Sequence, residues 1–184
     1  MAAATSEDAR AETCLLDTND DGNADSNVDT TGGADDDGEA TNLACGPNAS
    51  ATGDSNATAL GNSSSASTGG TAVGASAAAT GTNSTTIGLG ASASQEDSLA
   101  LGSSANASGL GAVSIGVGSA SSATSTIAIG DAASASQARS VAIGLNASAS
   151  GFDAIAIGTE ANAAAGDTIV LGDNAIADDT FAIA

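Results

Sequence analysis

The 184-residue chain contains no histidine, tryptophan or tyrosine, and its only aromatic residues are Phe152 and Phe181. A globular core normally relies on large side chains, so this composition excludes an ordinary one. What it can build is a flat, narrow interior, with alanine opposite valine, isoleucine and leucine. One such layer recovers little of the roughly 1.5 kcal/mol per residue that ordering costs, so stability has to come from neighbouring layers or from sister chains.

Basic residues are almost absent as well. The chain has no lysine, only Arg10 and Arg139 as arginines, and a net charge of −20. Phosphate binding needs clustered lysine and arginine, so nucleic acid is excluded as a partner. An anionic membrane surface would repel the chain too. Such acidity fits a salty or calcium-containing medium, in which counterions screen the charge.

The residues that usually perform catalysis are also missing. There is no histidine, and the glycine-rich stretches lack the lysine of a phosphate-binding loop. The acidic pairs Glu96/Asp97 and Asp178/Asp179 are adjacent in sequence, so on a strand their side chains would point apart. We therefore expect a protein that is not an enzyme.

No apolar run is long enough to cross a bilayer, and the first ten residues lack the apolar region of a signal peptide. We expect no membrane insertion. Either an export signal has been removed or the chain is intracellular. Two cysteines separated by a polar loop favour export, because disulfides persist in oxidising compartments. The expected location is extracellular or at the cell surface.

The segment from Cys14 to Cys45 is acidic and contains the spacing of a calcium loop, D-x-N-x-D-G-x-x-D. Alternating oxygen-bearing side chains face one side, and a glycine permits the sharp turn. Position twelve holds Val28 instead of the usual acid, and Asp29 follows it. The alternative is a disordered acidic loop. The predicted calcium ligands are Asp17, Asn19, Asp21, Asn23, Asp25 and Asp29.

Cys14 and Cys45 bracket this segment. A disulfide between them would close about thirty residues and contribute roughly 3–4 kcal/mol on the loop-entropy model. The alternative is a pair of free thiols in a reducing compartment. We predict the disulfide.

From Gly46 onward the chain repeats a unit of about fourteen residues. An apolar pair around a small residue, as in Val141-Ala142-Ile143, meets a glycine, and alanine then recurs at alternate positions. A period of two broken by glycine predicts strands, because a helix would space apolar residues by three and four. Fourteen residues accommodate two short strands and two tight turns, so each repeat is predicted to be one coil of an all-β, parallel β-solenoid.

This pattern divides the chain into three parts. Residues 1–13 are expected to be a loose arm, residues 14–45 the acidic calcium-binding loop, and residues 46–184 a roll of about ten coils. The roll also contains six Asn-x-Ser/Thr sequons, which are either glycosylation acceptors or chance products of the composition. They begin at Asn48, Asn56, Asn62, Asn83, Asn106 and Asn146.

The unit S-V-A-I-G-L-N-A-S-A-S-G, followed by D-A-I-A-I-G-T-E-A-N-A-A-A-G, resembles the head repeats of YadA-like trimeric autotransporter adhesins (Hep/Hag-type repeats). The resemblance extends over about residues 46–184 and implies a left-handed parallel β-roll, three chains side by side, and display on a bacterial surface. It implies a core that holds Ile129, Ile143, Ile157 and their partners. It also implies structural turn glycines at Gly88, Gly102, Gly116, Gly130, Gly144, Gly158 and Gly172.

Two functions follow from these observations. The first is a non-catalytic extracellular surface or appendage protein, a trimer that acts in adhesion to a host or neighbouring cell surface or as a structural fibre element. The second is a subunit that stacks end to end into a self-polymerising filament, since the C-terminal edge of the solenoid has no evident cap. Either way, the chain's main partner is expected to be itself.

Overall fold

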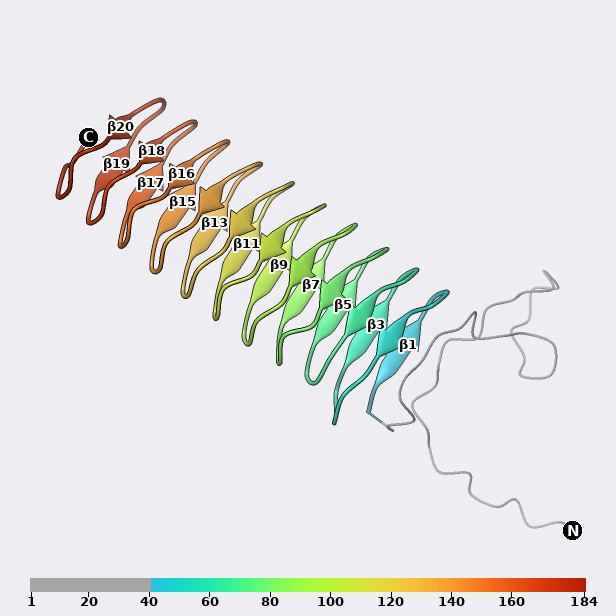
Figure 1. Cartoon of the computed structure of the whole chain (residues 1–184). Coiled ribbons are helices and arrows are strands. Elements are labelled where there is room, and N and C mark those ends of the chain that lie inside the picture. Colours follow the sequence, from blue (N-terminus) through green and yellow to red (C-terminus); the bar gives the residue numbers. More distant parts are fainter. Residues whose placement is uncertain (1–40) are drawn as a thin grey trace, which may run out of the picture.

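The computed structural model describes residues 41–184, which form one straight stack of coils (Figure 1). Each coil contains a three-residue strand and a two-residue strand, joined by tight turns. None of the described residues belongs to a helix that could cross a membrane.

The longer strands of successive coils form the first ten-stranded parallel sheet. Parallel pairing between equivalent strands of neighbouring coils means that every coil hydrogen-bonds to the ones before and after it. The strands of the first sheet are β1 (Leu43–Cys45), β3 (Thr58–Leu60), β5 (Thr71–Val73), β7 (Thr85–Ile87), β9 (Leu99–Leu101), β11 (Val113–Ile115), β13 (Ile127–Ile129), β15 (Val141–Ile143), β17 (Ile155–Ile157) and β19 (Ile169–Leu171).

The shorter strands form the second ten-stranded parallel sheet, opposite the first. The predicted all-β parallel solenoid, with two short strands in each coil, is therefore confirmed. The strands of the second sheet are β2 (Ser50–Ala51), β4 (Ser65–Ala66), β6 (Ala78–Ala79), β8 (Ser92–Ala93), β10 (Asn106–Ala107), β12 (Ala120–Ser121), β14 (Ser134–Ala135), β16 (Ser148–Ala149), β18 (Asn162–Ala163) and β20 (Ile176–Ala177).

The fourteen-residue repeat is the register of both sheets: Val141 pairs with Ile155, and Ser148 pairs with Asn162. Only the first coils deviate. Cys45 pairs with Leu60 and Leu60 with Val73, so one coil is a residue longer than the repeat and the next is a residue shorter. Because β1 already belongs to the first sheet, the roll starts before Gly46, and Cys45 lies in a strand.

Each strand of the first sheet is followed by a glycine, and in every coil but the last the stacking requires it. Gly102 has a φ of +131°, and a Cβ there would lie 2.5 Å from the carbonyl oxygen of Gly116 in the next coil. L-residues rarely adopt this backbone conformation, and the overlap would be with backbone that cannot rotate away. The close approach of successive coils at this turn is therefore possible only without side chains.

The interior holds mainly small side chains. The middle residue of each strand of the first sheet is buried; Ala142 in β15 and Ala156 in β17 are examples. The branched residues on either side of it point outward. The implied core of Ile129, Ile143 and Ile157 is therefore wrong, and Ile157 is 38% exposed. The reason is space: alanine, serine and threonine fill the gap between the two sheets, and Val170 is the largest fully buried side chain.

Hydroxyl groups replace alanine at several interior positions, and most donate a hydrogen bond. Ser114 Oγ and Ser119 Oγ lie 2.7 Å apart, and Ser121 Oγ donates to the Val113 carbonyl at 2.6 Å. These three serines interrupt the alanine pattern in one coil without disturbing the strand pairing of β11 and β12. The row of small interior residues therefore tolerates hydroxyl groups when these form hydrogen bonds with each other or with the backbone.

Three buried hydroxyls within residues 41–184 have no hydrogen-bond partner, and one of them is Thr86 Oγ1. Replacing Thr86 with valine keeps the shape and removes a desolvated hydroxyl, so we expect the protein to become more stable by about 1–2 kcal/mol. Thermal unfolding followed by circular dichroism measures this. Thr126→Val is the matched control, because Thr126 Oγ1 donates to the Ala123 carbonyl at 2.7 Å, and its loss should lower stability. A lower Tm for Thr86→Val would contradict the prediction.

Candidate functional site

The outer face of the first sheet is a stripe of mainly branched apolar side chains, called the apolar face below. It arises because the first and third residues of each strand point outward while the middle residue points inward. One of its two rows runs along the whole roll without a charged residue: Cys45, Leu60, Val73, Ile87, Leu101, Ile115, Ile129, Ile143, Ile157 and Leu171. The other row is Leu43, Thr58, Thr71, Thr85, Leu99, Val113, Ile127, Val141, Ile155 and Ile169.

Stacking alone does not remove these side chains from water. Neighbours in a row cover each other's edges, so most are half-buried, yet Ile87 remains 47% and Leu171 57% exposed. Ten strands spaced by ~4.8 Å give the face a length of about 43 Å. Monomeric soluble proteins rarely expose contiguous apolar surface on this scale, and larger patches mark interaction sites. The apolar face is therefore the strongest candidate site within residues 41–184.

The outer face of the second sheet has the opposite character and is called the polar face. The residue that points outward from each of its strands is small or polar in every coil except the last, where it is Ile176. The second-strand residues Ser50, Ser65, Ser92, Asn106, Ser134, Ser148 and Asn162 all occupy this row. The roll therefore has one face suited to burial and one suited to solvent.

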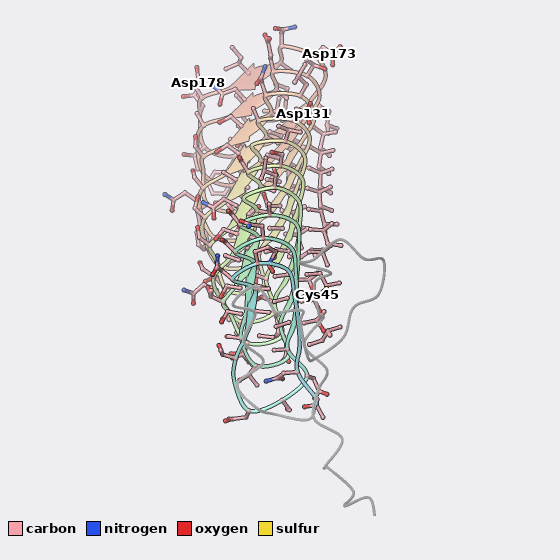
Figure 2. The ribbon with its side chains drawn as sticks, turned by 90° about the vertical axis from the view of Figure 1, so that its right-hand side faces the viewer. Cys45, Asp131, Asp173 and Asp178 are labelled. Atoms are coloured by element: carbon pink, nitrogen blue, oxygen red, sulfur yellow. The ribbon has the colours of Figure 1, made fainter. Side chains whose placement is uncertain are left out.

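Charge is confined to the turns. Asp131 and Asp173 follow the closing glycine of their coils and accept hydrogen bonds from the backbone N–H of Val117, at 3.1 Å, and of Thr159, at 3.0 Å. Each carboxylate thus ties its own coil to the preceding one. Figure 2 shows Asp173 and Asp178 on opposite sides of the roll. Acidic side chains therefore lie in the turns on both sides of the apolar face, where their charge favours contact with water.

The one basic residue among residues 41–184 joins two coils at the other turn. Arg139 donates from Nε and Nη2 to the two carboxylate oxygens of Asp153, at 2.6 and 2.5 Å. Its guanidinium also lies 4.1 Å from the ring centroid of Phe152, a cation–π contact. Hydrogen bonding to Asp153 raises the pKa of Arg139, and the same bonds lower the pKa of the Asp153 carboxyl. The arrangement reinforces the stack and presents no reactive group.

The predicted calcium ligands Asp17, Asn19, Asp21, Asn23, Asp25 and Asp29 lie outside the described residues. So does Cys14, hence both the calcium site and the Cys14–Cys45 disulfide stay predictions. Residues 41–184 contain no group of acidic and cysteine side chains that could hold a metal ion. Cys45 itself lies at the N-terminal end of the apolar face, in β1.

Sequence reasoning missed the apolar face because it assigned the branched residues to the interior. A signal for the correct phase was present. Ser114, Ser119 and Ser121 depart from the alanine pattern together in one coil, and they meet inside the roll. Substitutions that occur together in one repeat indicate residues that share an environment. The structure shows that this shared environment is the interior, because all three serines are buried.

A parallel β-solenoid with one apolar outer face defines a class, the repeat proteins whose stacked coils offer extended surfaces. The family model described as "YadA head domain repeat (2 copies)" matches residues 43–64, 93–119, 121–147 and 149–175, more than half of the chain. The chain therefore belongs to the YadA head repeat family. No curated protein matches it.

Among solved structures, the chain is similar to the one titled "Crystal structure of the collagen-binding domain of Yersinia adhesin YadA". The two share 27% sequence identity with a TM-score of 0.52, over 74% of this chain and 69% of the other. The family and this structure confirm the resemblance inferred from the repeats. Neither match concerns a filament built end to end, so that alternative gains no support from them.

Proposed function

We propose that this chain is the head of a trimeric, non-catalytic adhesin displayed on a cell surface. The observation that carries the proposal is the apolar face, because a family member whose repeats leave such a stripe uncovered needs sister chains to bury it. A closed trimer buries three copies of one face around a common axis, without an open end that could add further copies. The turns and the polar face remain outside.

The similar structure supports a proposal for the ligand. That protein's title describes a collagen-binding domain of an adhesin, and we propose an extracellular matrix protein of the collagen type as the ligand of this chain. A rigid rod with its exposed turns repeated along both edges suits a long, regular ligand. Three identical heads on one axis also raise the local concentration of binding surfaces, so weak single contacts combine.

A binding experiment on immobilised triple-helical collagen tests this proposal. The purified full chain should first show the mass of a trimer in sedimentation or light scattering, and should then bind collagen saturably in surface plasmon resonance. Heat-denatured collagen at the same density is the matched control surface, and binding to it should be weaker by at least tenfold. A trimer that binds neither native nor denatured collagen would contradict the proposed ligand but not the proposed trimer. A monomer would overturn the proposal itself.

A further inference from the structure

Inward and outward residues alternate along the roll, and this alternation decides which residues of a sequon are exposed. In Asn146-Ala147-Ser148 the alanine is fully buried, while the asparagine lies exposed at a turn and the serine points outward from β16. Asn106 lies exposed on β10, followed by buried Ala107 and then Ser108. In both of these sequons the amide and the hydroxyl therefore lie on the outside together, with the middle residue in the interior.

The side-chain amides of several sequon asparagines in the described part of the chain are also free of hydrogen bonds that a modifying enzyme would have to break. No hydrogen bond within residues 41–184 engages the side chain of Asn48, Asn106 or Asn146. The side chain of Asn62, by contrast, accepts a hydrogen bond from Ser63 Oγ at 3.1 Å. Asn106 lies on the polar face, away from the apolar face that self-association would cover. A bulky group on Asn106 would therefore project into solvent in a monomer and in a trimer.

We propose that the outward sequons, foremost those of Asn106 and Asn146, are N-glycosylation sites that accept a sugar from a diphosphate-activated glycosyl donor. In this transfer the asparagine Nδ2 forms a bond to the anomeric carbon of the sugar and gives up one proton to a base. The bond from that carbon to the diphosphate oxygen breaks, and the diphosphate leaves with its electron pair. Glycans would add hydrophilic bulk to the polar face and the turns and leave the apolar face free.

The competing explanation is that sequons are only a by-product of the register. Left-handed turn positions favour asparagine, and the serine row of the second sheet follows two residues later. The chain contains its own controls for this. Asn174 occupies the same turn position as Asn146, with φ of 57° against 55°, and Asn162 on β18 occupies the strand position of Asn106 on β10. Neither Asn162 nor Asn174 has a hydroxyl residue two positions later.

Peptide mass spectrometry of two samples decides between these explanations. The first is the protein recovered from cells that make it naturally. The second is the folded recombinant chain treated with a sequon-specific N-glycosyltransferase and a nucleotide-activated hexose. We expect sugar adducts on Asn106 and Asn146 in both samples and none on Asn162 or Asn174. In the native sample, one-hexose steps indicate a nucleotide-linked donor, and a single large increment indicates a lipid-linked oligosaccharide.

A substitution sharpens the test without risk to the fold. Ser148→Ala places at this outward position the residue that Ala78 and Ala120 already provide in other coils. It should abolish the adduct on Asn146 and leave that on Asn106 unchanged. Native protein with unmodified sequons, or a recombinant chain that accepts hexose only after denaturation, would overturn the proposal. Neither result bears on trimer formation or collagen binding, which are measured separately.

Discussion

Replacing Gly144 with alanine is expected to destabilise the roll more than any surface change. The backbone φ of Gly144 is +134°, and an added Cβ would overlap the carbonyl oxygen of Gly158 in the next coil. The conformation alone costs about 1–3 kcal/mol for a residue with a side chain. Relief of the overlap would have to separate these two coils, which hydrogen bonds such as Gly158 N–H to Ile143 O, at 2.9 Å, hold together. We therefore expect a loss of at least 4 kcal/mol, or no folded protein.

Two other glycines separate the causes of this loss. Gly172 has a φ of +137°, but a Cβ there would only graze the Ala175 side chain at 3.9 Å, so Gly172→Ala tests the conformational cost alone. Gly166 has no positive φ, and its Cβ would meet the Phe152 carbonyl at an ordinary 3.5 Å, so Gly166→Ala should be nearly neutral. Urea unfolding of the three variants gives the order. Equal losses for Gly144→Ala and Gly172→Ala would show that coil-to-coil contact is not what requires glycine.

Most of the architecture was predictable because it is repeated. The spacing of the closing glycines and the alternation between them define strand length, coil length and parallel pairing, and every repeat tests the same hypothesis again. The register of Val141 with Ile155 follows directly from the period. Family membership follows from the same repeats. The two irregular early coils also show in the sequence, as a shift in the glycine spacing around Gly74.

The orientation of the strands was not predictable from hydrophobicity. In a strand, inward and outward positions alternate, so the pattern Val141-Ala142-Ile143 has two phases that differ by one residue. The general preference for large apolar residues inside favours the wrong one here, because alanine, serine and threonine fill the space between the two sheets, with Val170 the largest fully buried side chain. The distance between the sheets is a property of the folded coil, which the hydrophobicity pattern along a strand does not encode. Which of the two phases applies decides whether the isoleucines of the first sheet form the core or the candidate interface.

The orientation leads to the second large expected effect. Changing Ile129 and Ile143 together to aspartate should convert the proposed trimer into monomers and leave the coil stack intact, because both side chains point outward from β13 and β15. Burying an isoleucine is worth about 1.5–3 kcal/mol, and three chains contribute two each. The double variant also brings like charges together around the axis. We expect the association to weaken by several orders of magnitude, since each 1.4 kcal/mol is tenfold.

The control must add the same charge elsewhere on the same coils. Ser134→Asp with Ser148→Asp does so on the polar face, from β14 and β16. Sedimentation velocity should then show a trimer for the control, a monomer for the Ile129/Ile143 variant, and the same far-ultraviolet circular dichroism for both. If the control dissociates and the isoleucine variant does not, the chains associate through the second sheet. If neither dissociates, the interface lies at the turns, where Arg139 and Phe152 offer the largest side chains.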